Sequence, residues 1–349
     1  MCLSREQIWV RLGDKRKEDR YKEKNKPMAL LGIDLGGTKL ALAAFTEDGK
    51  IIRKEMIPLG ELTGNEVGKL ITGQIRTILN SAGSKLDRIK AIGISVPGIS
   101  YQKTGKVWAP NIQGWNDYPL LEEVKQVSGE IPVAIDSDRA CYILGESWQG
   151  NARECKDAIF LAIGTGIGAG IMVNGEVLRG SNDIAGAAGW MALDRPFRDE
   201  YTDCGCFEYN ASGEGIAKVA GALLKVNQNY DGELKKIVPD KITSHNIFSA
   251  YDSGDRIALA VINQYIEYWG MAVANLVSLF NPEKIIFGGG VFGPAVRFLP
   301  DIRREALKWG QPISIKQVSI EASALGGDAG VYGAGYLALK ELSSVNNLL

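Results

Sequence analysis

Residues 159–180 read IFLAIGTGIGAGIMVNGEVLRG, an apolar run that is broken first by glycines and later by an Asn-Gly pair. Residues 164–169 fit the G-x-G-x-x-G/A pattern of dinucleotide-binding turns. That pattern requires a helix after the glycines, because the helix N-terminus receives the pyrophosphate. Here another β-like run, 169–173, and the turn signal Asn174-Gly175 follow instead. The residues therefore predict a glycine loop between two antiparallel strands, and they argue against an NAD-dependent oxidoreductase.

The same order of features occurs once more near the start of the chain. An apolar run at 30–34 leads into the glycine loop 35–38, then into the apolar stretch 39–45 and the turn Asp48-Gly49. Each copy predicts strand, glycine loop, strand, two-residue turn and strand. The repeat predicts two similar halves that face each other across a cleft, each an α/β unit with a mixed β-sheet flanked by helices.

Hydrophobic periodicity places further elements between and after the two copies. Helices are expected at 65–81, 119–127, 139–149, 213–226, 254–280, 294–306 and 330–342, and short strands at 89–96, 133–135 and 284–287. The last helix is expected to cross back to the first half. Residues 28–137 together with about 330–345 are thus predicted to form a smaller N-terminal domain, and residues 138–329 a larger C-terminal one.

Composition limits the partners and the compartment. The 349 residues carry a formal net charge of −1, which gives no electrostatic reason to expect a nucleic acid or a membrane as partner. Five cysteines, an odd and sparse set, favour a reducing, cytoplasmic location. Residues 1–27 are rich in charge and are predicted to be a solvated, disordered tail. The single histidine, His245, stands at an expected helix start, which disfavours histidine-based nucleophilic catalysis.

Seven motifs occur in order along the chain and resemble those of one family. They are DLGGTK at 34–39, VPG at 96–98, PNIQGW at 110–115, Asp138 with LGE at 144–146, GTGIG at 164–168, GGG at 288–290 and DAG at 328–330. In this order they resemble the ROK family of sugar kinases and sugar-responsive regulators, which are actin-like (ribonuclease-H-like) ATPases. The resemblance implies a two-domain actin-like fold and ATP-dependent phosphorylation of a sugar hydroxyl, with ATP and Mg²⁺ as cofactors.

The resemblance also assigns the nucleotide side of the site. Glycines let backbone amides approach phosphate oxygens without obstruction, and Asp34 is expected near Mg²⁺, through water. The alternative interpretation is a set of plain turns and a close strand–helix crossing. By resemblance the phosphate-binding residues are Asp34, Gly36, Gly37, Thr38, Lys39, Gly164, Thr165 and Gly166, and the adenosine-binding residues are Gly288, Gly289 and Gly290.

Asp138 aligns with the catalytic aspartate of the family. Its carboxylate would accept the proton of the sugar hydroxyl while the γ-phosphoryl group arrives in line. The alternative is that Asp138 or Ser137 merely caps the following helix, a role compatible with catalysis. Asn111 is expected to bind the sugar, with Trp115 supporting its loop, although an Asn-stabilised turn would explain Asn111 equally.

The sugar side departs from the family pattern at several positions. Ser137 stands where the family has asparagine, Ala187 where it has glutamate, and Trp190 where it has a histidine that contacts sugar and zinc. Trp190 is expected to stack on a sugar ring, and Glu208 remains available to a sugar hydroxyl.

The zinc motif of the family is also degenerate. Only Gly205, Cys206 and Glu208 match it, and Cys204 and Cys206 alone cannot supply about four zinc ligands. No zinc or other protein-held metal is therefore expected. Packing by Trp190, Phe197, Tyr201 and Phe207 is expected to replace the zinc.

The resemblance thus implies a kinase of a hexose or an N-acetylhexosamine with Asp138 as base. The alternative is a sugar-binding sensor or regulator with weak or no catalysis. Residues 1–27 are too short for the winged helix of the family's repressors, so no nucleic-acid partner is expected. A small sugar is the expected partner, and a homodimer fits the resemblance.

Overall fold

The computed structural model describes residues 29–81, 89–227 and 229–346, so the prediction of a disordered tail at 1–27 lies outside the described residues. A mixed five-stranded sheet is formed in the order β3-β2-β1-β4-β7. β1, β2 and β3 form an antiparallel meander, while β4 and β7 run parallel to β1. Its strands are β1 (Ala29–Leu35), β2 (Lys39–Phe45), β3 (Ile51–Pro58), β4 (Ile89–Val96) and β7 (Val133–Ser137).

The second sheet repeats this topology strand for strand. Its order is β10-β9-β8-β11-β12, with an antiparallel meander followed by two parallel strands. The repeat read from the two glycine loops is therefore confirmed. The strands are β8 (Ala158–Ile163), β9 (Ile167–Val173), β10 (Glu176–Val177), β11 (Lys284–Gly288) and β12 (Ser319–Ala322). A small hairpin of β5 (Ile99–Tyr101) and β6 (Lys106–Trp108) is appended to the first half.

The seven helices predicted from the periodicity occur to within a few residues, except that the helix expected at 294–306 begins as a 3₁₀ turn, Pro294–Phe298. The longer helices are α2 (Gly64–Leu79), α3 (Leu120–Ser128), α4 (Asp138–Gln149), α7 (Gly213–Val226), α8 (Ser244–Asp252), α9 (Arg256–Phe280), α10 (Leu299–Trp309) and α12 (Ala329–Asn346). The short ones are α5 (Tyr201–Cys204), α6 (Cys206–Ala211) and α11 (Ser314–Gln317). No helix among the described residues is long and apolar enough to cross a membrane.

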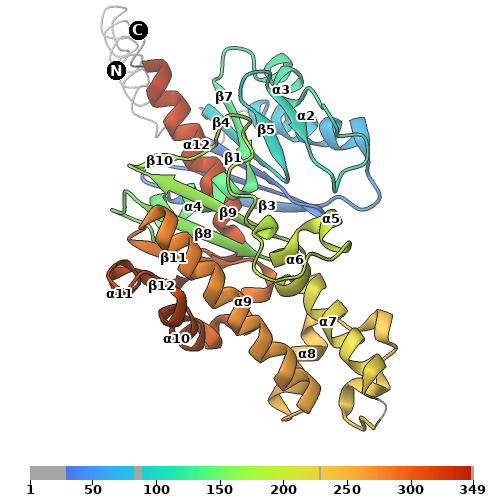
Figure 1. The fold of residues 1–349 in the computed structure, drawn as a ribbon. Helices are drawn as coiled ribbons and strands as arrows, with labels where there is room; N and C mark the ends of the chain where they lie inside the picture. Colours follow the sequence, from blue (N-terminus) through green and yellow to red (C-terminus); the bar gives the residue numbers. More distant parts are fainter. Residues whose placement is uncertain (1–28, 82–88, 228, 347–349) are drawn as a thin grey trace, which may run out of the picture.

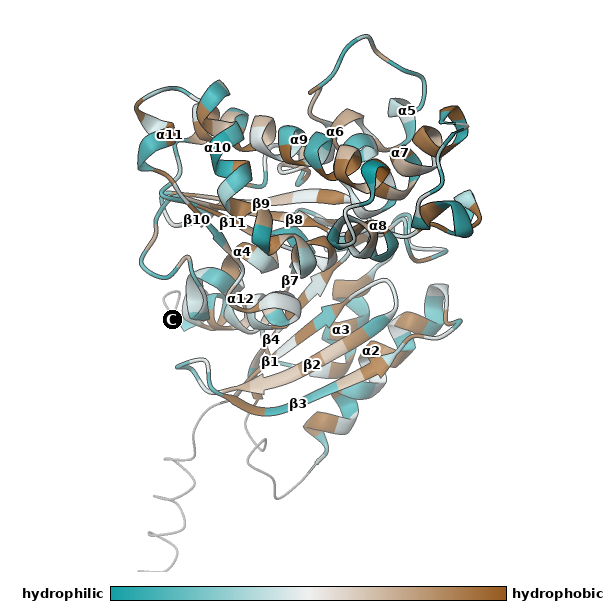
Figure 2. Cartoon of the chain, turned by 90° about the horizontal axis from the view of Figure 1, so that it is seen from below, coloured by the Kyte–Doolittle hydropathy of each residue, from teal (hydrophilic) through white to brown (hydrophobic). Residues whose placement is uncertain are grey.

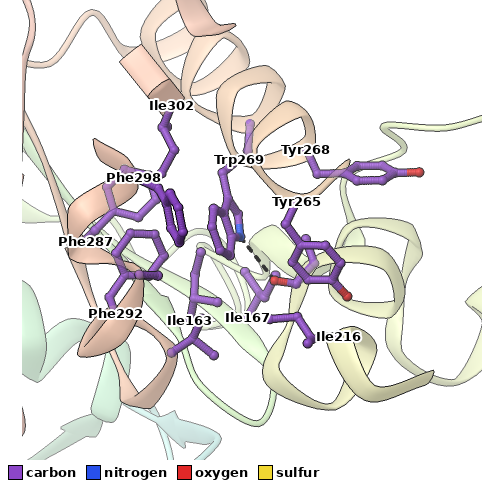
Figure 3. Packing of buried hydrophobic residues seen from close by; sticks show 14 of the residues in the cluster. Ile163, Ile167, Ile216, Tyr265, Tyr268, Trp269, Phe287, Phe292, Phe298 and Ile302 are labelled. Atoms are coloured by element: carbon purple, nitrogen blue, oxygen red, sulfur yellow. Dashed lines mark hydrogen bonds between the residues drawn. The ribbon is translucent and has the colours of Figure 1, made fainter. Parts of the chain in front are cut away.

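The elements stack in layers, with α4 and α12 between the two sheets (Figure 1, Figure 2). α2 and α3 cover the outer face of the first sheet, where Val67, Ile71 and Val124 join its core. α9 covers the second sheet. Figure 3 shows its Trp269 beside Phe287, Phe292 and Ile163, with the indole N–H bonded to a backbone carbonyl, that of Ala211 at 3.1 Å.

This aromatic core anchors the second glycine loop. Ile163 ends β8 and Ile167 begins β9, and both side chains are buried in the cluster around Trp269. Burying an isoleucine side chain stabilises a fold by about 1.5–3 kcal/mol. The loop 164–166 is therefore held at both ends.

Glycine residues let the two central helices pack closely against each other and against the first sheet. A Cβ on Gly333 of α12 would lie 1.8 Å from the carbonyl oxygen of Cys141 on α4. A Cβ on Gly93 of β4 would lie 1.9 Å from the carbonyl oxygen of Ala334. Only glycine permits both approaches, because backbone atoms cannot move aside as a flexible side chain can.

Two polar contacts tie the C-terminal halves of these helices to the two hairpins. The side-chain amide of Gln149, at the end of α4, donates to the carbonyl of Asp48 between β2 and β3 at 2.9 Å. Lys340 of α12 pairs with Glu176 of β10 at 3.0 Å. Each tie joins one of the two central helices to a hairpin, and the two hairpins belong to different sheets.

Candidate functional site

Asp34 ends β1 at the edge where the parallel strands of the first sheet finish. Ser95, at the equivalent place on β4, donates a 2.6 Å hydrogen bond to Oδ1 of Asp34. Gly330, at the start of α12, packs so closely that an added Cβ would lie 2.4 Å from Oδ2. Burial raises the pKa of Asp34, which Ser95 and Lys39 oppose and Asp328 reinforces. The carboxylate is thus held in place by Ser95 and packed against Gly330.

Asp138 begins α4 directly after β7, and the charge of Asp34 acts on its carboxyl group. Ser137 is the cap of this helix, because its Oγ accepts from the backbone N–H of Ala140 at 3.3 Å. Ser137, and not Asp138, is therefore the residue that caps the helix. The Asp138 carboxylate lies in the first turn, where it accepts a hydrogen bond from the backbone N–H of Arg139 at 2.7 Å. Burial raises the pKa of Asp138 to about 6, Arg139 opposes this and Asp34 adds to it. A base of that pKa suits proton transfer near neutral pH.

Two other carboxylates influence the ionisation of this region. Asp328 raises the pKa of Asp34, which Lys39 opposes, and Asp34 in turn raises the pKa of Asp138. A divalent cation that rests mainly on phosphates and waters would reduce the repulsion among such carboxylates.

A cavity of about 530 Å³ lies beside the second glycine loop. Gly164, Thr165 and Gly290, which the sequence assigned to phosphate and adenosine, line it together. Residues that the sequence analysis did not assign complete the wall: Gly213, Glu214, Ala217, Ile242, Thr243, Ser244, His245 and Val291. The volume and the glycine lining fit a nucleotide.

His245 stands at a helix start, as predicted, and it also faces this cavity. Thr243 precedes α8 and forms a capping box with Asn246, which was readable as a helix signal. The position of His245 at the cavity could not be predicted from the sequence, because it depends on how α7 and α8 pack together.

Other predicted nucleotide residues lie outside the lining of this cavity. Residues 36–39 form a turn between β1 and β2, closed by the Gly36 N–H on the Lys39 carbonyl at 2.9 Å, and Gly37, Thr38 and Lys39 are exposed. A Cβ on Gly288 would meet the Phe160 ring at 2.2 Å, and one on Gly289 would meet the Ile163 backbone at 2.5 Å. Of the three glycines at 288–290, Gly290 is the one that lines the cavity.

Glu208 of α6 connects the sugar side to the second glycine loop. Its Oε2 accepts the backbone N–H of Ile167 at 2.6 Å, directly after that loop. Added Cβ atoms on Gly166 and Gly189 would lie 2.7 and 2.9 Å from Oε2 of Glu208. Burial raises the pKa of Glu208. The structure thus places a predicted sugar contact against a predicted phosphate contact.

Trp190 and Asn111, two more of the predicted sugar residues, are both exposed. Trp190 ends the short turn Ala188–Trp190 and is 57% exposed, which leaves its ring free to stack. Asn111 lies exposed on the loop after β6. Trp115 supports that loop as expected, because it is buried, bonds the Gly64 carbonyl at 2.9 Å and stacks on Tyr118 at 4.3 Å.

The region of the degenerate zinc motif is only partly packed as predicted. Tyr201 and Phe207 are buried, but Phe197 is 69% exposed and Trp190 points outward too. The expectation that all four aromatics fill the place of a zinc is therefore wrong for Trp190 and Phe197. Cys206 is buried beside the amide of Asn210, and Cys204 is half-buried.

A model of the ROK family matches residues 30–341, almost the whole chain. The chain belongs to the ROK family. Among its sequence relatives, the glucokinase of Halalkalibacterium halodurans is 33% identical over 323 residues, which cover 90% of this chain and 96% of the relative. The xylose repressor of Caldicellulosiruptor bescii is 30% identical over 322 residues, which cover 90% of this chain and 79% of the relative.

A solved ROK structure has the same architecture. The ROK family glucokinase of Streptomyces griseus, crystallised with glucose and AMPPNP, superposes with a TM-score of 0.70 at 28% identity, covering 89% of this chain and 99% of that one. The expected actin-like ATPase fold, with two helix-flanked mixed sheets, is confirmed. ROK members include both sugar kinases and repressors.

Proposed function

We propose that this ROK protein is an ATP-dependent kinase of a sugar hydroxyl, with Asp138 as the general base. The observation that carries the proposal is the Asp138 carboxylate, fixed at the start of α4 beside Asp34 with a pKa of about 6. A group with this pKa is ionised at neutral pH yet basic enough to accept a proton in the transition state.

The nucleotide is proposed to lie in the 530 Å³ cavity, with its phosphates toward Gly164 and Thr165. Backbone amides of the glycine loops would hold the phosphate oxygens and the charge that develops on them. Magnesium, when bound with ATP, neutralises charge on the phosphates. Asp34, held by Ser95, would orient it through water. Gly36–Lys39 would contribute from the opposite sheet.

The sugar is proposed to lie between Asp138, Glu208, Asn111 and Trp190. Asp138 would accept the proton of the attacking hydroxyl, while Glu208 would accept a bond from another hydroxyl. The indole of Trp190 would stack on an apolar face of the ring, as its exposure allows. Ser137 is occupied as a helix cap, which leaves its hydroxyl proton free for the sugar. No protein-held zinc is proposed.

A sugar-binding sensor is the second candidate, and a specific observation favours it. Ala187 and Trp190 stand where the family has hydrogen-bonding side chains, and a site that loses such groups loses discrimination. The xylose repressor shows that the family also contains regulators. This candidate keeps the same fold and the same sugar pocket but performs no phosphoryl transfer.

A coupled assay with Mg²⁺·ATP over hexoses, N-acetylhexosamines and polyols tests the proposal. Turnover of at least one sugar, lost by about 10²–10⁴-fold in Asp138→Ala, is the expected result. Sugar-dependent thermal stabilisation without turnover above the Asp138→Ala background would establish the sensor instead.

We also propose that residues 28–137 with about 330–345 move as one domain against 138–329. Support comes from α12, which packs on β1 and β4 of the first sheet. Closure of the two parts around substrates would exclude water from the transfer step.

A further inference from the structure

An ion pair joins the segment after β10 in the second half to β7 in the first half. The side chain of Arg179, two residues after β10, reaches Asp136 on β7, and its Nε lies 3.0 Å from Oδ2. Nη2 of Arg179 donates to the same oxygen. Asp136 is 3% exposed and Arg179 is half-buried, so the pair is largely shielded from water. Such a pair is costly to break, because one charge would remain buried alone.

A second bond attaches the same segment to the β5–β6 hairpin of the first half. The carboxylate of Asp183 accepts the backbone N–H of Gln102, which follows β5, at 3.1 Å. The side-chain amide of Gln102 in turn donates to the carbonyl of Ile135 on β7 at 2.9 Å. Asp183 has a φ of +59°, a conformation that few residues other than glycine adopt unless the surrounding structure holds them in it. The segment is therefore bound to β7 twice, once directly and once through the hairpin.

The same segment is also bound to the second sheet and leads to the turn that bears Trp190. The backbone N–H of Ala185 donates to the carbonyl of Arg179 at 3.0 Å, which closes residues 179–185 into a loop, here called the bridging loop. The carbonyl of Gly186, the next residue, accepts a backbone N–H of β9 at 2.8 Å. The short turn that ends at Trp190 follows directly. The bridging loop thus connects both halves to this turn.

The elements that the bridging loop contacts continue into the proposed sugar contacts. β7 continues into Asp138, two residues after the ion-paired carboxylate. The β5–β6 hairpin continues into the loop with Asn111, and the bridging loop itself continues into the turn with Trp190. Because these contacts come from both halves of the molecule, their spacing depends on what holds the halves together. The ion pair and the backbone bond of the bridging loop both cross between the halves here.

We propose that Arg179 is a positioning residue of the sugar site, because its bond to the first half sets where Trp190 lies relative to Asp138. This inference rests on the proposed function, since it takes the proposed sugar contacts as given. Arg179 touches no substrate in this role, and two of its N–H donors are bound to Asp136. Within the described part of the chain, the bridging loop adds no residue to the wall of the 530 Å³ cavity, so ATP binding is expected to be independent of it.

Calorimetry without nucleotide tests this role, with the hexose, N-acetylhexosamine or polyol that the wild type binds most tightly. Arg179→Gln is expected to raise the Kd for that sugar by about two- to thirtyfold, the range for changes that act on a site through other residues. Kd for AMPPNP is expected to stay unchanged, and Arg179→Lys, which keeps the charge, restores part of the sugar affinity. Arg304→Gln is the matched control, because it breaks an arginine–aspartate pair of 2.6 Å within α10 and should leave both constants unchanged.

Two further comparisons separate positioning from stability. Asp183→Gly removes the other bond of the bridging loop, and glycine accepts the positive φ, so sugar binding should weaken without added strain. Asp183→Asn keeps an acceptor and should bind sugar as the wild type does. In a Trp190→Ala background the effect of Arg179→Gln on sugar affinity should shrink, because the contact that it positions is gone.

A lower melting temperature with unchanged sugar affinity in Arg179→Gln would overturn the inference and leave the ion pair a structural contact. An equal effect of Arg179→Gln with and without Trp190 would overturn it as well. If Arg179→Gln does not fold, the pair Asp183→Gly and Asp183→Asn decides the question. If the wild type binds a sugar but transfers no phosphoryl group, the proposed kinase fails while these affinities still decide the role of Arg179. A wild type that binds no sugar would overturn both proposals.

Discussion

The backbone N–H of Ile167 donates a 2.6 Å hydrogen bond to Oε2 of Glu208, which joins the second glycine loop to α6. One carboxylate thereby fixes the residue after the proposed phosphate contacts and faces the proposed sugar position. A change at Glu208 is therefore expected to affect both stability and sugar binding.

Glu208→Ala leaves the N–H of buried Ile167 without its acceptor, and an unsatisfied buried donor costs about 1–3 kcal/mol. We expect a lower melting temperature and a higher KM for the sugar. Glu208→Gln is the control, because its amide oxygen can accept the same bond. Equal melting temperatures for Ala and Gln variants would show that the bond contributes nothing.

The pH dependence of kcat/KM should follow Asp138. Because burial raises the pKa of Asp138 to about 6, the carboxylate is ionised above that pH and protonated below it. We expect kcat/KM to fall about tenfold per pH unit below pH 6, measured with saturating Mg²⁺·ATP. Activity that stays constant down to pH 5 would contradict this assignment.

Asp138→Asn should lose activity without losing stability. A carboxyl whose pKa is higher in the folded state favours folding at low pH, and this contribution is lost as pH rises toward 6. Above pH 6 the charged form opposes folding, by up to about 3 kcal/mol for a pKa raised from 3.8 to about 6. The Asn variant is therefore expected to melt higher than the wild type at pH 8 and similarly at pH 4. Lower stability at pH 8 would mean that lost activity reports unfolding.

Gly290→Val should block the nucleotide and spare the fold. A Cβ on Gly290 meets nothing within 4 Å, and the residue lines the 530 Å³ cavity, so the side chain would enter space proposed for ATP. We expect a higher KM for ATP with an unchanged melting temperature. Gly289→Ala is the contrasting variant, because its φ of +92° and the Ile163 backbone at 2.5 Å predict destabilisation. Unchanged ATP binding in Gly290→Val would place the nucleotide elsewhere.

Trp190→Ala should weaken sugar binding at little cost in stability. The side chain is 57% exposed, so its removal leaves no cavity in the core. Loss of a stacking ring is expected to raise KM for the sugar by about two- to tenfold, because an aromatic contact contributes about 0.5–1.5 kcal/mol. Trp115→Ala, which removes a fully buried ring, should instead destabilise by about 3–5 kcal/mol. A Trp190→Ala variant with unchanged sugar KM would remove Trp190 from the site.

Gly93→Ala should destabilise the contact between β4 and α12. Its Cβ would lie 1.9 Å from the Ala334 carbonyl, and overpacking of this kind costs about 1–3 kcal/mol or more. Gly73→Ala on α2 is the matched control, since nothing lies within 4 Å and alanine favours helix by up to about 1 kcal/mol. Opposite changes in melting temperature are expected, and equal ones would contradict the close approach.

The features that the sequence predicted well depend on neighbouring residues. The two hairpins were readable because Gly49, Asn174 and Gly175 adopt the positive φ angles that Asp-Gly and Asn-Gly turns require. The N-terminal cap of α4 was readable in the same way. The place of His245 at the 530 Å³ cavity was not, because it depends on the packing of α7 and α8.

Side-chain direction was the other limit. Arg139 stands next to the proposed base in the sequence, but its path over Gly168 to the Gly98 carbonyl depends on how two sheets meet. The exposure of Phe197 and Trp190 likewise depends on where the segment after β10 turns. The degenerate zinc motif predicted that both aromatics pack in place of the metal, and the tertiary structure leaves both exposed.

The ties Gln149–Asp48 and Lys340–Glu176 lie in the C-terminal halves of α4 and α12, while Asp138 and the glycine against Asp34 lie at the N-terminal ends of these helices. Each central helix therefore has a site residue or its neighbour at one end and a surface contact with a hairpin further along. Because Gly333 and Gly93 bring backbone against backbone, a disturbance at either surface contact would reach the site through a rigid body and not through a flexible loop.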